Sequence, residues 1–270
     1  MTWLAAALLG IVQGLTEFLP VSSSAHLVLA RAFFGWNVDE GAFGLAFDVS
    51  CHVGTLVAVL IYFRRDIARM IAAVPELLSA DRGSGKVARL IAIGTIPVVI
   101  VGLLLAKWLE EHMRTPAVIA ITLTVGGIWL LAAERFGART REEDALTAGG
   151  ALLVGTAQAS ALIPGMSRSG STIAMAMLLG LTRESAARFS FLLGIPAITA
   201  GAAKEGIHLF KTGITAADAQ LFAIGMISAA AVGFLTIKFL IRYLAGHSLN
   251  VFAYYRLALA AVTVAWLLTR

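Results

Sequence analysis

The chain has 270 residues, of which 59% are hydrophobic and only 14% are charged, and its formal net charge is +5. About a quarter of the residues in an ordinary soluble domain are charged, so this composition excludes such a domain and predicts an all-α polytopic membrane protein. No polar stretch is long enough for a second domain, and we expect one membrane domain over residues 1–270. The positive charge is typical of basic loops that face anionic lipid, and we expect no nucleic-acid partner.

The first half predicts one broken hairpin followed by three membrane spans. Residues 2–19 and 21–34 are apolar, but each is marginal against the roughly 20 residues that cross a bilayer. Pro20 separates them, so we interpret the pair as a re-entrant helix-break-helix hairpin. The first segment lacks a basic start and a small-residue cleavage site, and we expect it to remain in the mature protein. The predicted spans are 44–63, 90–107 and 116–134.

The second half repeats this pattern. Residues 147–163 and 168–181 flank a second break, and further spans are predicted at 184–205, 218–241 and 249–269. One hairpin and three spans make an odd number of crossings. The second repeat, about 147–270, must therefore be inverted relative to the first, about 1–134, and this architecture places a site at mid-membrane. Chance similarity between apolar segments is the alternative.

The basic residues predict the orientation. On one side, the loops 64–89, 135–146, 182–188 and 238–248 hold 13 Lys and Arg residues, against six on the other. The richer side should be cytoplasmic, which places both termini outside. We expect Glu134 and the acidic residues 142–144 to lie in a solvated cytoplasmic loop, and residues 108–115 to form a short loop on the outer side.

A carboxylate, hydroxyls and an imidazole gather at the first break. Gln13 and Glu17 are four residues apart and share a helix face, and Ser22, Ser23 and His26 follow Pro20. A buried carboxylate without a role is costly, so we expect a functional role for Glu17. The serines could instead only cap a helix, and the histidine could be a satisfied structural residue.

The second break combines an arginine with hydroxyl side chains. Arg168 lies among Ser167, Ser169 and Thr172, directly after the Pro164-Gly165 pair. A charge at membrane depth costs several kcal/mol, so it is normally placed where it binds a ligand or lines a wet cavity. A helix that restarts near Ser167 would aim its free N–H groups at the same ligand, which favours phosphate.

Three further residues are weaker candidates. Asp48 and His52 are four residues apart and could line the same cavity or simply bond to a neighbouring helix. For Arg256 we favour a structural role, as a partner of backbone carbonyl groups.

Both breaks resemble signatures of the undecaprenyl-pyrophosphate phosphatase family of bacteria. Residues 13–26, which run from Gln13 through Glu17 to His26, resemble its (Glu/Gln)-x-x-x-Glu motif and the serine-histidine continuation. Residues 164–172 resemble its second signature, Pro-Gly-x-Ser-Arg-Ser-x-x-Thr. The resemblance runs along the whole chain, including Tyr255 and Arg256.

The resemblance implies a membrane phosphatase of the bacterial inner membrane whose active site faces the periplasm. Such enzymes convert undecaprenyl pyrophosphate into undecaprenyl phosphate, the lipid carrier for peptidoglycan, and are linked to bacitracin resistance. The motif match gives catalytic positions and substrate-binding positions. The catalytic positions are Glu17, Ser23, His26 and Arg168, and the substrate-binding positions are Gln13, Ser22, Ser167, Ser169 and Thr172.

The resemblance also implies a divalent cation, Mg²⁺ or Ca²⁺, with Glu17 as a metal ligand. Gln13 stands where some members have glutamate, which removes one anionic ligand. Several alternatives stay open at this point. Ser23 or His26 could attack the terminal phosphorus, or Glu17 could activate water; we favour a serine. A flippase of polyprenyl phosphate lipids is the main rival function, and a homodimer is an open assembly.

Overall fold

The computed structural model describes residues 2–34, 42–77, 79–212 and 215–269, and these residues form an all-helical protein. The helices are α1 (Trp3–Phe18), α2 (Ser23–Phe34), α3 (Ala42–Tyr62), α4 (Arg64–Ala72), α5 (Gly83–Met113), α6 (Pro116–Phe136), α7 (Ala148–Ser160), α8 (Arg168–Leu178), α9 (Arg183–Thr212), α10 (Ala216–Leu244) and α11 (Asn250–Leu268). Two short 3-10 turns, η1 (Val74–Glu76) and η2 (Glu143–Ala145), lie in the connections.

Five of these helices, α5, α6, α9, α10 and α11, are long and apolar enough to cross a membrane. A sixth span is formed if α3 and α4, which meet at an angle of 72°, count as one broken helix. Large apolar side chains such as Leu103 and Ile121 are exposed on the outer faces of these helices. A bilayer would cover them, and the prediction of a polytopic helical membrane protein is confirmed.

Two predicted loops are wrong in part. Residues 64–89 contain α4 and the first residues of α5, and α5 continues to Met113 through the predicted outer loop. An α-helix satisfies its backbone hydrogen bonds internally, so it can continue through charged residues beyond its apolar centre. The hydropathy pattern reported only the apolar centre of α5.

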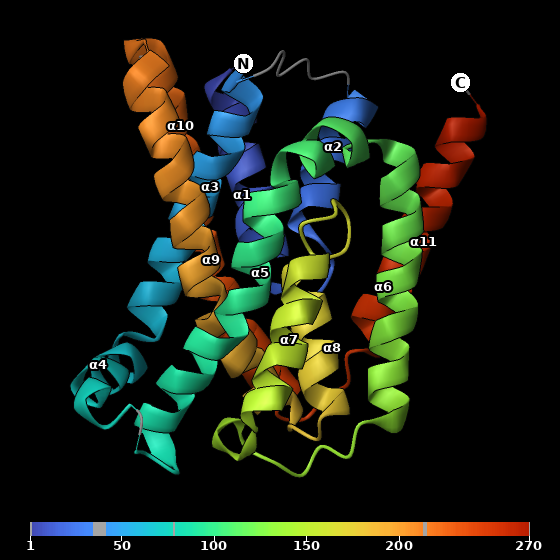
Figure 1. Cartoon of the computed structure of the whole chain (residues 1–270). Coiled ribbons are helices and arrows are strands. Elements are labelled where there is room, and N and C mark those ends of the chain that lie inside the picture. The colour runs from blue at the N-terminus through green and yellow to red at the C-terminus, as the bar shows by residue number, and fades with distance from the viewer. Residues whose placement is uncertain (1, 35–41, 78, 213–214, 270) are drawn as a thin grey trace.

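Short helices, joined in pairs by tight turns, occupy the two regions where hairpins were expected. α1 and α7 have 16 and 13 residues, and their partners α2 and α8 have 12 and 11. Figure 1 shows α1 and α2 reaching from the end of the molecule that holds both termini, while α7 and α8 reach from the opposite end. Their tips, residues 19–22 and 161–167, approach each other inside the helical bundle.

Glycines allow the first helix of each hairpin to pack closely on a long helix. α1 packs along α10, and α7 packs along α5. A Cβ atom at Gly10 would clash with the carbonyl oxygen of Gly225, and one at Gly155 with that of Gly94. Only a residue without a side chain permits this approach between helices.

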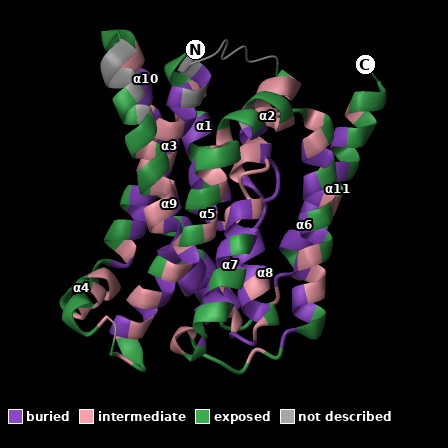
Figure 2. Cartoon of the chain, viewed as in Figure 1, coloured by how far each residue is buried: buried purple, intermediate pink, exposed green. Residues whose placement is uncertain are grey.

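The tip of the first hairpin lies against a buried apolar core (Figure 2). Phe18, at the end of α1, is fully buried and packs edge-on against Phe191 of α9, with ring centroids 5.2 Å apart. Phe63 and Leu193 belong to the same core. The functional groups at the tips are therefore held by rigid neighbours.

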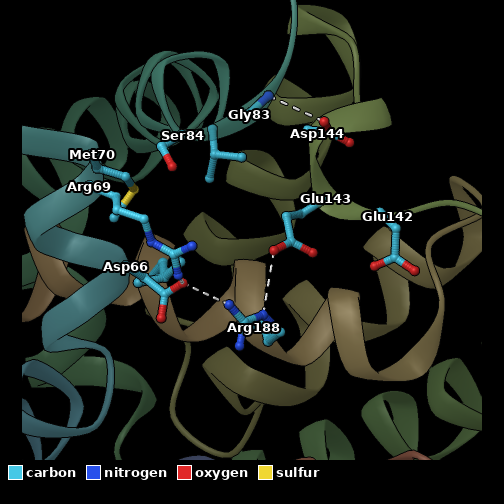
Figure 3. A pocket seen from close by; sticks show the side chains of 11 residues that line it. Asp66, Arg69, Met70, Gly83, Ser84, Glu142, Glu143, Asp144 and Arg188 are labelled. Carbon is cyan, nitrogen blue, oxygen red and sulfur yellow. Dashed lines mark hydrogen bonds and ion pairs between the residues drawn. The ribbon is translucent and has the colours of Figure 1, made fainter. Parts of the chain in front are cut away.

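Ion pairs hold together the end of the molecule opposite the termini. Arg188 of α9 donates hydrogen bonds to Asp66 of α4 at 2.9 Å and to Glu143 of η2 at 3.4 Å, at the edge of a cavity of about 370 Å³ (Figure 3). Its guanidinium also lies over the ring of Phe63. These contacts anchor the amphipathic helix α4 to the bundle.

Glu134 departs from the expected solvated loop. It is buried at the end of α6, where it accepts hydrogen bonds from Arg139, Arg183 and the backbone N–H of Leu249. α4 and the connection after α6 lie at the same end of the molecule, as the count of Lys and Arg residues in the loops required (Figure 1). On the other side of that count, Arg270 and the side chain of Lys211 lie outside the described residues.

Candidate active site

The two tips have the same local backbone geometry. Ser22 and Ser167 have φ angles of 75° and 69°, in the region that few residues other than glycine adopt. The hydroxyl of Ser22 accepts from the N–H of Ala25, and that of Ser167 accepts from the N–H of Gly170. Each serine thus caps the helix that follows it. Strained caps of this kind concentrate at functional sites.

Arg256 holds the two tips together. Its side chain is fully buried, and it donates to the carbonyl of Pro20 in the first tip and to those of Gly165 and Met166 in the second. It also donates to the carbonyl groups of α6 at residues 122 and 123. This confirms the expected structural role, and it leaves a positive charge beneath the site.

Side chains also join the tips directly. The hydroxyl of Ser24 accepts from the N–H of Gly165 at 3.1 Å, and the hydroxyl of Ser169 donates to the carbonyl of Leu19 at 3.1 Å. Ser169, a predicted substrate-binding residue, is therefore engaged in joining the hairpins.

Glu17 is the centre of the site. Its Oε1 accepts from Arg168 at 2.7 Å, and its Oε2 accepts from Ser23 at 2.7 Å and from Gln13 at 2.9 Å. The structure thus brings together four residues that the sequence predicted from two distant segments. His52 Nε2 lies 3.5 Å from Glu17 Oε2, so a residue that was only a weak candidate belongs to the same cluster.

Thr172 lies behind Arg168. Its hydroxyl donates to the carbonyl of Arg168 at 2.7 Å and lies 2.5 Å from the hydroxyl of Ser190. Arg168 itself also donates to the carbonyl of Ser190, at 3.4 Å. Ser190 was not predicted, because it lies in an apolar span with no local signal. Together these contacts orient the arginine toward Glu17.

His26 points away from this cluster. Its Nδ1 is 2.7 Å from the carbonyl oxygen of Ser22, and its Nε2 is 2.7 Å from the hydroxyl of Tyr255. The two rings stack with centroids 5.6 Å apart. The structure therefore places His52, and not His26, beside the carboxylate of Glu17.

Two adjoining cavities share the residues of this cluster. The smaller one, of about 100 Å³, is polar and is lined by the hydroxyls of both tips together with Glu17, His52 and Arg168. The larger one, of about 260 Å³, shares those three residues, but most of its wall is apolar and comes from α3, α5 and α9. A polar chamber beside an apolar one matches a phosphate group on a hydrocarbon chain.

Asp48 and His52 both line a third cavity, of about 310 Å³, as the sequence suggested, and α5 contributes to its wall. The carboxylate of Asp48 accepts from both Arg31 and Arg114. The four-residue spacing correctly placed Asp48 and His52 on one face of α3. The sequence could not show that Asp48 is paired with two arginines whereas His52 lies next to Glu17, because both arrangements depend on tertiary contacts.

The residues at the site are compatible with a divalent cation. Among the described residues, no three His, Cys, Asp or Glu side chains are grouped to hold a metal. Glu17 supplies one carboxylate, however, and the buried Oε1 of Gln13 has no hydrogen-bond partner. Mg²⁺ commonly takes one or two protein carboxylates and completes its shell with water and substrate phosphates.

Comparisons with known proteins match nearly the whole chain. The family model of the bacitracin resistance protein BacA matches residues 6–262. An undecaprenyl-diphosphatase of Rubrobacter xylanophilus is 45% identical over 98% of both chains. Proteins of the same name from Hahella chejuensis and Alcanivorax borkumensis are 43% and 44% identical, over 99% of this chain and 99% and 100% of their own.

Proposed function

This chain belongs to the family of the bacitracin resistance protein BacA, and we propose that it is a membrane phosphatase that hydrolyses undecaprenyl pyrophosphate to undecaprenyl phosphate and inorganic phosphate. The observation that carries the proposal is the cluster of Glu17, Ser23 and Arg168 in a polar cavity that adjoins an apolar one. The product is the carrier lipid for cell-wall synthesis, and its recycling accounts for the link to bacitracin.

Arg168 is the residue that would bind the terminal phosphate. A guanidinium can form two parallel hydrogen bonds to phosphate oxygens, and it stabilises the charge that spreads over them in the transition state. α8 begins at Arg168 and α2 begins at Ser23. The first N–H groups of both helices add donors and the positive ends of two helix dipoles.

Ser23 is the proposed nucleophile, and Glu17 is its base. The hydroxyl already donates to Glu17 Oε2 at 2.7 Å, within the reach that proton transfer requires. Attack forms the Oγ–P bond and breaks the bridging P–O bond, and undecaprenyl phosphate leaves with the electron pair. Water then hydrolyses the phosphoserine, which releases inorganic phosphate and restores the serine hydroxyl.

The two histidines have different proposed roles. His52, 3.5 Å from Glu17, is placed to assist proton movement at the carboxylate. His26 supports the strained turn at Ser22 through the carbonyl bond and is itself held by Tyr255. A divalent cation bound with the substrate, held by Glu17 and the amide oxygen of Gln13, would neutralise phosphate charge.

We propose that the halves 1–134 and 147–270 form one domain of two inverted repeats with re-entrant hairpins. Three observations support this: each hairpin packs on a long helix of the other half, both tips have a serine with positive φ, and the hairpins extend from opposite ends.

The basic loops then face the cytoplasm. We propose that the site faces the periplasm, because α5 ends at Met113 at the end of the molecule that holds the termini, beside the cavity lined by Asp48, His52 and Arg114.

Lipid accounts for the exposed apolar surface of the bundle, so no homodimer is needed to bury it. The named relatives are phosphatases, and no observation favours the flippase.

The test is phosphate release by the purified protein in detergent from undecaprenyl pyrophosphate, with and without Mg²⁺ or Ca²⁺. Glu17→Ala and Arg168→Ala should lose activity while remaining folded, and Leu103→Ala, on a lipid-facing surface, should retain it. A folded parent that releases no phosphate with any cation would refute the proposed function. Transfer of undecaprenyl phosphate across vesicles without hydrolysis would support the flippase instead.

A further inference from the structure

Gln158 of α7 is a buried amide without a protein partner. Its residue is 1% exposed, and neither Nε2 nor Oε1 has a hydrogen-bond partner in the described part of the chain. Because both atoms are unpaired, exchanging the two in the amide plane would not change this observation. The side chain lines the larger, mostly apolar cavity, together with Glu17, His52 and Arg168.

An unpaired buried amide destabilises the protein that contains it. Leaving one buried donor or acceptor without a partner costs about 1–3 kcal/mol, and native proteins contain few such groups. Gln13, which stands at the matching place in the first half, donates its Nε2 to Glu17. Gln158 has no such neighbour, so its donor is available to a ligand in the cavity.

The position of Gln158 separates it from the reacting groups. The small polar cavity is lined by Ser23, Glu17 and Arg168 but not by Gln158. The terminal phosphate has to occupy that cavity, since Ser23 must reach its phosphorus. A pyrophosphate that also enters the larger cavity, through the residues the two share, brings its second phosphate toward Gln158.

We propose that Gln158 binds the proximal phosphate, the one that stays on the lipid, by donating Nε2–H to a non-bridging oxygen. This inference rests on the proposed function. Beyond this phosphate, the cavity wall is apolar and includes Val98 of α5 and Ile198 and Ala202 of α9. The first isoprene units lie there, between α5 and α9. Gln158 therefore distinguishes a lipid phosphate from free phosphate.

The test compares Gln158→Met with the parent. Methionine has similar volume but cannot donate, so the variant removes the hydrogen bond without a cavity. The measurements are the KM for undecaprenyl pyrophosphate, the Kd of undecaprenyl phosphate, the inhibition constant of inorganic phosphate and the thermal midpoint without lipid. Thr156→Val, on the exposed face of the same helix, is the matched control.

We expect KM and the Kd of undecaprenyl phosphate to rise together, by about tenfold to a hundredfold, as the loss of a hydrogen bond to a charged group predicts. The inhibition constant of inorganic phosphate and kcat should change less than threefold, and the thermal midpoint should not fall. Gln158→Glu should weaken lipid binding further, because it brings a negative charge to phosphate.

Unchanged KM and Kd in an active Gln158→Met variant would overturn the inference. So would an equal rise in the inhibition constant of inorganic phosphate, which would assign Gln158 to the terminal phosphate. A lower thermal midpoint with unchanged lipid affinity would show a structural residue. An inactive parent that still binds undecaprenyl phosphate more tightly than Gln158→Met would refute the phosphatase and leave this inference standing.

Discussion

Glu17 and Arg168 are partners in the structure, yet the proposed mechanism needs them to interact with different groups. The 2.7 Å ion pair between them uses the guanidinium that phosphate would engage. In the proposed reaction, phosphate draws Arg168 toward itself, and Glu17 loses the hydrogen bond that the guanidinium donates to it. A buried pair of this kind adds little net stability, which suits a contact that must open in each reaction cycle.

Glu17→Gln should lower kcat by about a hundredfold to ten-thousandfold, the usual contribution of a general base. The amide keeps the volume and can still contact Arg168 and Ser23, so the fold should be retained. Steady-state kinetics in detergent, with thermal unfolding as the folding control, measures both. A kcat within fivefold of the parent would remove Glu17 from the chemistry.

Ser23→Ala should abolish the phosphoenzyme. In the parent, stopping turnover with acid should trap phosphate on Ser23, detected by mass spectrometry. Ser160→Ala, whose hydroxyl donates to its own helix at Ala157, is the control. Incorporation of oxygen-18 from water into phosphate in a single step, without any phosphoserine, would favour direct attack of water activated by Glu17.

The chemical identity of the site was readable from the sequence because its members are adjacent to helix breaks. Glu17, Ser23 and Arg168 stand out as polar groups in apolar surroundings, and the structure places them in contact. The neighbours that orient them were less visible. Ser190 lies in an ordinary apolar span. The orientation of the His26 side chain depends on its contact with Tyr255, which is 229 residues away in the chain.

At the scale of helices, Arg256 links the tips of both hairpins to α6. The guanidinium of Arg256 satisfies carbonyl groups from both tips and from α6. The sequence could suggest that this arginine binds backbone carbonyl groups. It could not show that these carbonyl groups come from the two helix breaks. Glu134 illustrates the same limit, since its burial comes from residues 139, 183 and 249, which are separated in sequence.

Arg256→Leu should destabilise the protein and disorder the site. It would leave the carbonyls of Pro20 and Gly165 without this donor, at about 1–3 kcal/mol for each buried group left unpaired. The thermal midpoint and the activity should both fall, and Arg256→Lys should recover part of the stability. Tyr254→Phe, on the exposed side of α11, is the control. A normal thermal midpoint in Arg256→Leu would contradict this role.

Gly155→Ala should force α7 away from α5, because the new Cβ meets the carbonyl oxygen of Gly94. Overpacking at such a contact costs about 1–3 kcal/mol. Gly149→Ala, in the first turn of the same helix, meets no atom closer than 3.9 Å and should be neutral or slightly stabilising. The thermal midpoints of the two variants are compared by unfolding both in the same detergent. Equal midpoints would contradict the close contact proposed at Gly155.

For the whole molecule, the composition and the hydropathy pattern were sufficient to predict an all-helical membrane protein. They located the centres of the long helices but not their ends, because charged end residues continue a helix into the interface. The angle of 72° between α3 and α4 could not be predicted. It depends on contacts such as Arg188 with Asp66, between residues 122 positions apart.

The orientation can be measured at the two ends of α5. Ser79 precedes this helix, Glu111 lies in its last turn, and both are exposed. With Cys51 replaced by alanine, Glu111→Cys should react with a membrane-impermeant maleimide added outside spheroplasts, and Ser79→Cys should react only after lysis. The reverse pattern would place the site on the cytoplasmic side.

We expect the small size of the polar chamber to restrict which molecules can reach Ser23. At about 100 Å³ it admits little more than one phosphate group, and its neighbour is walled mainly by hydrocarbon side chains. A soluble diphosphate such as a nucleotide would have to force a hydrated sugar and base among those walls. We therefore expect the protein to hydrolyse soluble nucleotides poorly, because polar groups that leave water for an apolar cavity without new hydrogen bonds lose free energy.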